Sequence, residues 1–331
     1  PAIPVSINEI FSKSITFERT RYTEPYVTDS ILIDLFEDKK DEVKKTFFSG
    51  LKLKEKFNTQ RKVEAYFKTD KTFDNKIKQG LYDLISNVIF FEVPDSNGQE
   101  FHFRFAMQDT YSFKNLDRHS QKELTAIYVD YFFHRQDELW KKEAMKKLPG
   151  LKSNTAMLVC GEDLGMVPHC VPEVMEQLGI LSLEIQRMPK KTGSEFFHPN
   201  DAPYLSVVSP STHDMSTIRG WWEEDNFKTK HFFNHLMGQN GEPPFYCEAW
   251  INKEIILQHL YSPAMWSIFQ LQDLMGMNAD LRREDPNEER INIPAEAEHY
   301  WNYRMHINLE DLLNEKAFTE ELKNYIKESG R

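Results

Sequence analysis

Apolar residues follow two different patterns along the 331 residues of this chain. Up to about residue 149 the chain is rich in lysine, and its apolar positions mostly recur every three or four residues, as on one face of a helix. From Asn154 onward, short continuous apolar runs alternate with helical stretches, which is typical of strands followed by helices. The pattern predicts a mostly helical region over 1–149 and an α/β region over 150–331.

A long amphipathic helix is predicted in the first region. The segment from Ser120 to Glu123 has the form of a capping box, in which the first and fourth side chains bond to each other's backbone N–H groups. The apolar residues that then recur at helical spacing are Leu124, Ile127, Tyr128, Tyr131 and Leu139. We expect this helix to start at Ser120 and to end near Pro149.

A β-hairpin is predicted before that helix. Two apolar runs, 88–93 and 101–105, flank the turn-forming residues 94–98. In the second run, phenylalanines at 101, 103 and 105 alternate with polar residues, as they do on a strand with one buried face.

Four apolar runs mark the predicted strands of the second region: 156–160, 181–186, 205–209 and 266–271. Continuous apolar runs of this length suit parallel strands that are covered on both faces. Helices are expected between and after the strands, most clearly at 171–178, at 227–236 and in the charged tail 314–331. Four such units are half of an eight-stranded barrel.

Composition and charge narrow the class of partner. The chain has 41 basic and 52 acidic residues, a net charge of -11 and no basic stripe, so its field would repel a nucleic acid. No apolar stretch is long enough to span a bilayer, and the first residues lack the features of a signal peptide. Three widely spaced cysteines fit a reducing compartment. We therefore expect a cytoplasmic protein with no nucleic-acid or membrane partner.

Two acidic motifs follow predicted strands. Glu162 and Asp163 come after the run 156–160, and His213 and Asp214 come after the run 205–209. Barrel enzymes keep their chemistry at the carboxyl ends of the strands, and cleavage of a glycosidic bond needs an acid together with a second carboxylate. Two other interpretations remain open. The Glu-Asp pair could cap the start of a helix, and the His-Asp pair could be a sugar clamp or a structural pair at a turn.

Other polar and aromatic residues carry less information. His231 and His235 have the i, i+4 spacing of metal ligands, but no motif supplies a third ligand, so no metal is expected, and the pair at 169–170 is interpreted in the same way. Trp266 lies on an apolar run and is predicted to be core. Trp301 and Tyr303 follow a proline-bounded loop and are better placed to stack on a ligand.

Several stretches resemble the amylomaltase or 4-α-glucanotransferase family, glycoside hydrolase family 77, and most closely its disproportionating-enzyme branch with a long insertion in the barrel. The matching stretches are VCGEDLGMVP at 159–168, SPSTHDMSTIRGWW at 209–222, SPAMW at 262–266, QD at 272–273, RINIP at 290–294 and YWNYR at 300–304. The first region is also similar, at 128–132 and 137–140. The resemblance implies the C-terminal half of a (β/α)8 TIM barrel over 150–331, preceded by a mostly helical insertion over 1–149.

The resemblance also implies roles for single residues. Glu162 would be the general acid/base and Asp214 the carboxylate that stabilises the transition state. His213 and Asn292 would contact the sugar, and Trp301 is the aromatic residue expected beside it. Members of the family transfer glucan segments by a retaining double displacement. The implied substrates are maltose, malto-oligosaccharides and glycogen-like α-1,4-glucans, and no metal or organic cofactor is implied.

One part of the family's pattern is missing. The family's nucleophile is an Asp in an Arg-x-Asp-His motif at the end of the fourth barrel strand, and the sequence contains no such motif. Asp34 lacks the Arg and His neighbours, and Arg135 and Asp137 lie in a charged predicted helix. We expect the chain to be the C-terminal piece of a longer enzyme, inactive without its N-terminal part. A non-catalytic glucan-binding half-barrel and a related α-glucan hydrolase remain as alternatives.

Overall fold

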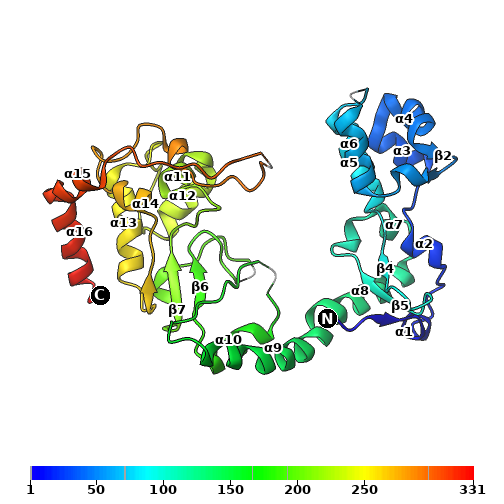
Figure 1. The fold of residues 1–331 in the computed structure, drawn as a ribbon, viewed down its shortest axis with the longest axis horizontal. Helices are drawn as coiled ribbons and strands as arrows, with labels where there is room; N and C mark the ends of the chain where they lie inside the picture. Colours follow the sequence, from blue (N-terminus) through cyan, green and yellow to red (C-terminus); the bar gives the residue numbers. More distant parts are fainter. Residues whose placement is uncertain (1, 71, 166, 192, 297) are drawn as a thin grey trace. The chain divides into compact units, whose positions relative to one another are not determined.

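The computed structural model describes residues 2–331 except 71, 166, 192 and 297. Contacts divide the chain into two compact units, residues 1–142 and 143–331 (Figure 1). None of the helices that the described residues form is both long and apolar enough to cross a membrane. The assignment of 1–149 to an insertion and 150–331 to a barrel remains a prediction.

The first unit consists mainly of helices. Their bounds are α1 Ile7–Ser12, α2 Arg19–Thr23, α3 Asp29–Phe36, α4 Lys40–Phe47, α5 Gln60–Thr69, α6 Asn75–Ile85, α7 Tyr111–Lys114 and α8 Arg118–Phe133. Several helices begin after a side chain that accepts a backbone N–H of the first turn, as Thr28, Thr59 and Asp74 do for α3, α5 and α6. Such caps satisfy N–H groups that have no partner inside the helix.

The predicted hairpin is confirmed. Strand β4, Phe90–Glu92, pairs antiparallel with β5, Glu100–Phe103, with Phe90 opposite Phe103. The turn between them contains Asp95, Asn97 and Gly98, all at positive φ, where these residue types are tolerated. A third strand that the sequence did not predict, β1 Val5–Ser6, pairs with the other edge of β5. Two residues are too few to show a periodic pattern.

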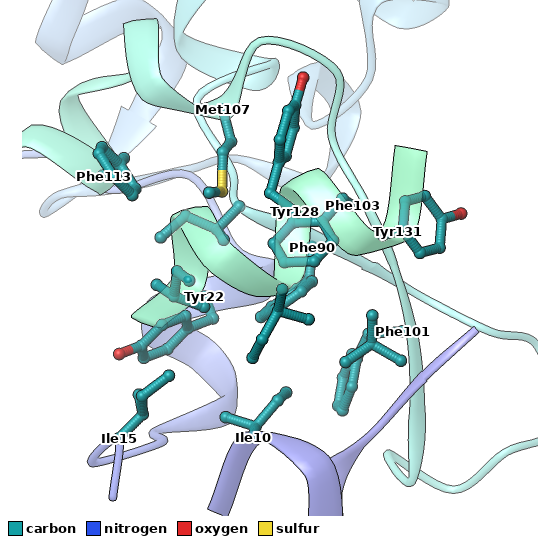
Figure 2. Packing of buried hydrophobic residues seen from close by; sticks show 14 residues of the cluster. Ile10, Ile15, Tyr22, Phe90, Phe101, Phe103, Met107, Phe113, Tyr128 and Tyr131 are labelled. Atoms are coloured by element: carbon teal, nitrogen blue, oxygen red, sulfur yellow. The ribbon is translucent and has the colours of Figure 1, made fainter. Parts of the chain in front are cut away.

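One core of the first unit lies between this small sheet and α8. Phe90, Phe101 and Phe103 of the strands gather with Tyr128 and Tyr131 of α8 (Figure 2). The rings of Phe90 and Phe103 are 4.5 Å apart, and that of Phe103 is 5.5 Å from Tyr128 in an edge-on arrangement. The second core, which includes Phe47, is formed by residues of α3 to α6 and the segments between them. Aromatic packing of this kind explains why Phe101 and Phe103 form a strand, whereas Phe105, predicted to continue it, lies outside β5 and is 55% exposed.

The prediction of one long helix was wrong in two respects. Asp117 is the cap of α8, because its carboxylate accepts the N–H of Ser120 at 3.0 Å and the hydroxyl of Ser120 at 2.7 Å. The helix then breaks at His134, whose φ of -132° lies outside the helical range. The next helix, α9, covers Arg135–Ser153 and continues past Pro149.

The second unit has α/β architecture. Its parallel sheet has the order β6, β7, β8, with bounds Ser182–Ile185, Ser206–Ser209 and Trp266–Ser267. An isolated parallel bridge joins Cys160 to Leu181. The helices are α10 Cys170–Leu178, α11 Ile218–Glu224, α12 Asn226–His235, α13 Ala249–Leu260, α14 Leu271–Met275, α15 Leu309–Asn314 and α16 Lys316–Glu328. Parallel pairing and the three predicted helices are thus confirmed.

The strands predicted at the two edges of the sheet, 156–160 and 266–271, are shorter in the structure. Of the run 266–271 only two residues pair, and of the run 156–160 only Cys160 does. The prediction that Trp266 is core was also wrong, because it is 51% exposed. These segments lie at the two edges of the sheet, where burial depends on what covers the edge and not on how apolar the segment is.

Candidate functional site

A cavity of about 730 Å³ lies at the carboxyl end of the parallel sheet. Alternate strand residues form part of its wall, Leu183 and Ile185 from β6 and Val207 from β7, because successive side chains point to opposite faces of a sheet. The loops after the strands supply the polar groups, which include Glu162, Thr212, His213, Asp214 and Gln270. The cavity therefore combines an apolar floor with a polar rim.

The structure brings the predicted site residues together. Glu162 and Asp214 line the same cavity. Asn292 Nδ2 donates to Asp214 Oδ1 at 2.6 Å, and its backbone N–H donates to His213 O at 3.1 Å. The ring of Trp301 lies 4.9 Å from that of His213 at an angle of 48°. The roles given to these residues remain predictions.

Thr212 holds the turn of the loop around Asp214. Thr212 satisfies the turn, because its hydroxyl accepts the N–H of Asp214 at 3.3 Å and its carbonyl accepts that of Met215 at 3.1 Å. His213 Nε2 lies 3.3 Å from Asp214 Oδ2, and both side chains are about half exposed. The His-Asp pair is therefore not needed to close the turn, and its role as a sugar clamp stays a prediction.

Glu162 does not cap a helix. The next helix, α10, starts at Cys170, eight residues later. Asp163, in contrast, is buried, and its Oδ1 accepts the N–H of Leu183 at 2.9 Å. Adjacent acids therefore have different tasks: Glu162 is exposed toward the cavity, whereas Asp163 fixes the loop to β6.

Asp273 is a buried carboxylate to which the sequence assigned no role. Burial raises its pKa, while hydrogen bonds from the Ser211 hydroxyl and the Ile218 N–H and the charge of Arg187 act in the opposite direction. Ile218 N donates to Asp273 Oδ1 at 2.7 Å, and Ser211 Oγ donates to Oδ2. Asp273 thus joins both ends of the loop that carries Asp214. The matching stretch Gln272-Asp273 marked this residue in the sequence, but two residues do not show that a side chain is buried.

A second buried charge pair supports the segment that leads to Asn292. Arg219 Nη1 donates to Glu289 Oε1, and both side chains are almost completely buried. Burial raises the pKa of Glu289, and the neighbouring Arg219 opposes that rise. Gln272 Nε2 donates to the carbonyl of Glu289 at 3.1 Å. These contacts attach residues 283–290 to α11 and α14.

Other sequence candidates lie outside this group. His231 and His235 have their rings 6.0 Å apart, and His231 Nδ1 lies 3.0 Å from Glu195 Oε2. The described residues contain no group of three or more His, Cys, Asp or Glu that could hold a metal ion. Tyr303 lies under the guanidinium of Arg283, 6.0 Å from its ring centre.

Neither of the acidic residues considered in the first unit ends a strand. Asp34 is an exposed residue of α3, and Asp137 lies in the first turn of α9. Arg135 is occupied by ion pairs with Glu9 and Asp130.

Comparison with known proteins gives a consistent family. The profile described as 4-alpha-glucanotransferase matches residues 45–310. The 4-alpha-glucanotransferase DPE2 of Oryza sativa subsp. japonica is 37% identical, over 100% of this chain and 36% of that protein. The 4-alpha-glucanotransferase of Chlamydia trachomatis is 29% identical, over 63% of this chain and 37% of that protein.

Among solved structures, an amylomaltase from Streptococcus agalactiae in complex with acarbose aligns at 22% identity with a TM-score of 0.41, covering 55% of this chain and 34% of that one. The chain spans little more than a third of the length of the two curated relatives, 36% and 37%. With four-fifths of its length matched by the profile, from residue 45 to residue 310, the chain belongs to the 4-alpha-glucanotransferase family.

Proposed function

We propose that this chain carries the acid/base part of a site that transfers α-1,4-glucan segments, with Glu162 as general acid/base and Asp214 as the stabilising carboxylate. The observation that carries the proposal is that both carboxylates line one cavity at the carboxyl end of a parallel sheet. Retaining transfer uses a general acid/base and a nucleophile at one glycosidic bond, and Glu162 would supply the first of these two groups.

The proposed sugar contacts are His213, which lines the cavity, and two residues that contact the His213-Asp214 pair. His213 and Asn292 present hydrogen-bonding groups beside Asp214, and Trp301 offers an exposed aromatic face next to them. An aromatic face stacks on the apolar face of a pyranose, while the polar groups bind its hydroxyls. The proposed substrates are maltose, malto-oligosaccharides and glycogen-like glucans.

We further propose that the second unit is the last four β/α units of a (β/α)8 barrel and that the first is a mostly helical insertion. Support comes from the parallel succession of Cys160, β6, β7 and β8 in chain order. The proposed compartment is the cytoplasm, which agrees with the three free cysteines.

The isolated chain is expected to disproportionate maltose negligibly. Retaining transfer needs a nucleophile that forms the glycosyl-enzyme, and the sequence has no Arg-x-Asp-His motif. The proposed activity therefore belongs to an enzyme in which another segment supplies that Asp.

A chimera tests the proposal. The rice relative DPE2 aligns with the whole of this chain, so its matching segment can be replaced by residues 1–331. We expect the chimera to convert maltose into glucose and longer oligomers, separated by chain length, and Glu162→Gln to abolish most of that transfer. Transfer that is unaffected by Glu162→Gln would remove this residue from its role.

The same assay separates the alternatives. Glucose without longer oligomers would indicate a hydrolase. Binding of acarbose or maltoheptaose to the isolated chain, with an inactive chimera, would indicate a non-catalytic glucan-binding module.

A further inference from the structure

One short segment contacts both loops that carry the candidate carboxylates. Residues 186–190 follow β6 directly and contain two cations, Arg187 and Lys190. We propose that these two residues position Glu162 and Asp214 relative to each other, each cation holding one of the two loops. This inference rests on the proposed function for the roles of Glu162 and Asp214. The contacts of Arg187 and Lys190 do not depend on that function.

Lys190 holds the loop of Glu162. Its Nζ donates to Asp163 Oδ2 at 2.6 Å and to Glu184 Oε1 at 2.7 Å. Asp163 and Glu184 are buried and line a second cavity, separate from that of Glu162. Because Asp163 is next to Glu162 in the chain, fixing one side chain fixes the backbone from which the other projects.

Arg187 holds the loop of Asp214. Its Nε donates to Pro210 O at 3.0 Å, and its Nη2 donates to Ser216 O at 2.5 Å. These carbonyls lie four residues before and two residues after Asp214. Burial lowers the pKa of Arg187 to about 10, so the guanidinium stays charged near neutral pH.

Stability alone does not account for these contacts. The ion pairs of Lys190 cost desolvation, and replacing a whole buried pair by apolar side chains is often neutral or stabilising. What a cation adds is a fixed direction for each hydrogen bond. Since both cations belong to one five-residue segment anchored in β6, the two loops cannot shift independently. Catalysis is sensitive to such shifts, because a misplacement of about 1 Å can cost roughly 100-fold in rate.

Hydrogen–deuterium exchange of the full chain, followed by mass spectrometry, tests the Lys190 contact. In Lys190→Met we expect exchange of residues 161–165 and of Leu183 to rise about tenfold, because the two charge-assisted bonds to Asp163 and Glu184 are lost, while residues 211–217 stay unchanged. Lys190→Arg keeps a cation within reach of the carboxylates and should restore most of the protection.

The matched control is Lys253→Met. Lys253 pairs with Glu321 at 2.6 Å and has the same side-chain exposure as Lys190, 29%, but its partner lies in α16 and not in a loop that carries a candidate carboxylate. Equal exchange of residues 161–165 in Lys190→Met and Lys253→Met would overturn the assignment of Lys190.

Arg187→Met should give the reverse pattern, with faster exchange at residues 211–217 and little change at 161–165. If that variant does not fold, Arg187→Lys, which keeps the charge but loses the two-nitrogen fork, is measured instead. A failure of Arg187→Lys to fold would contradict the proposal, because Arg187 would then hold the whole unit and not one loop.

Binding of maltoheptaose, measured by titration calorimetry, separates this inference from the proposed function. Both Met variants should bind the sugar at least about threefold more weakly than Lys253→Met does. If exchange rises locally in the variants but no form of the chain, wild type included, binds sugar, the positioning role stands and the proposed function is rejected. Loosening with unchanged sugar affinity would reject the positioning role.

Discussion

The two units differ in the kind of polar residue that is buried inside each of them. In the first unit, the buried polar residues that the structure describes are Asn87, Thr110, Ser112, Ser120 and Gln136, and none of them is charged. In the second unit, Asp163, Glu184, Arg219, Asp273 and Glu289 are all buried. Its buried charges lie in or beside the loops that surround the candidate site.

The difference shows where each unit needs order. Apolar side chains pack without fixed direction, so they stabilise a body but specify the position of a loop poorly. Buried charges cost desolvation and are tolerated only where partners meet them in one geometry. The second unit has such charges in or beside the loops of Glu162 and Asp214, and the first unit contains no comparable arrangement among its described residues.

The largest expected effect concerns chemistry. In the rice chimera, Glu162→Gln should lower kcat for maltose disproportionation by about 10²–10⁴, because a general acid/base is lost. Asp34→Asn in the first unit is the matched control and should leave kcat unchanged, since Asp34 is an exposed helical residue. A comparable loss in Asp34→Asn would show that the first unit takes part in catalysis.

Apolar packing in the first unit can be broken at Phe47. This side chain is completely buried among Phe57, Phe67 and Phe73. Phe47→Ala should lower the free energy of unfolding by about 3–5 kcal/mol, since it removes apolar contacts and leaves a cavity. Urea unfolding followed by far-ultraviolet circular dichroism measures the change, and Phe91→Ala, at a side chain 52% exposed, should have little effect.

Charge burial in the second unit can be broken at Arg219. Arg219→Met leaves Glu289 buried without its cation, which should cost about 3–5 kcal/mol of unfolding free energy. Tryptophan fluorescence can follow this unit, because five of the six tryptophans lie in it. Lys44→Met removes an exposed ion pair of the first unit and should change nothing measurable. If both variants behaved alike, the contrast between the units would be wrong.

His259 should make the second unit sensitive to acid. The residue is completely buried, and burial lowers its pKa to about 4 from an ordinary value of 6.5. Between these values the unfolded chain binds more protons than the folded one, so stability should fall by about 3 kcal/mol as the pH drops from 6.5 to 4. Comparing urea unfolding of wild type and His259→Gln at pH 7 and pH 4.5 isolates this contribution. Equal losses in both proteins would show that other groups cause the acid sensitivity.

Features that depend on a few neighbouring residues predicted secondary structure well. The hairpin at β4 and β5 was predicted because turn residues and alternating phenylalanines act within a few positions of each other. The helix start was misplaced by a few residues because Asp117 and Ser120 are both good caps, and only the geometry selects between them.

The sequence by itself determined the family, the parallel succession of strands and the residues that now line one cavity, because long motifs and apolar runs are properties of neighbouring positions. Only the tertiary structure decided which apolar positions stay exposed, as Trp266 does, and which charges are buried, as Asp273 is. Burial and charge pairing depend on residues brought together from distant segments, such as Arg187 with Ser216 and Ser211 with Asp273. No local pattern encodes those distances.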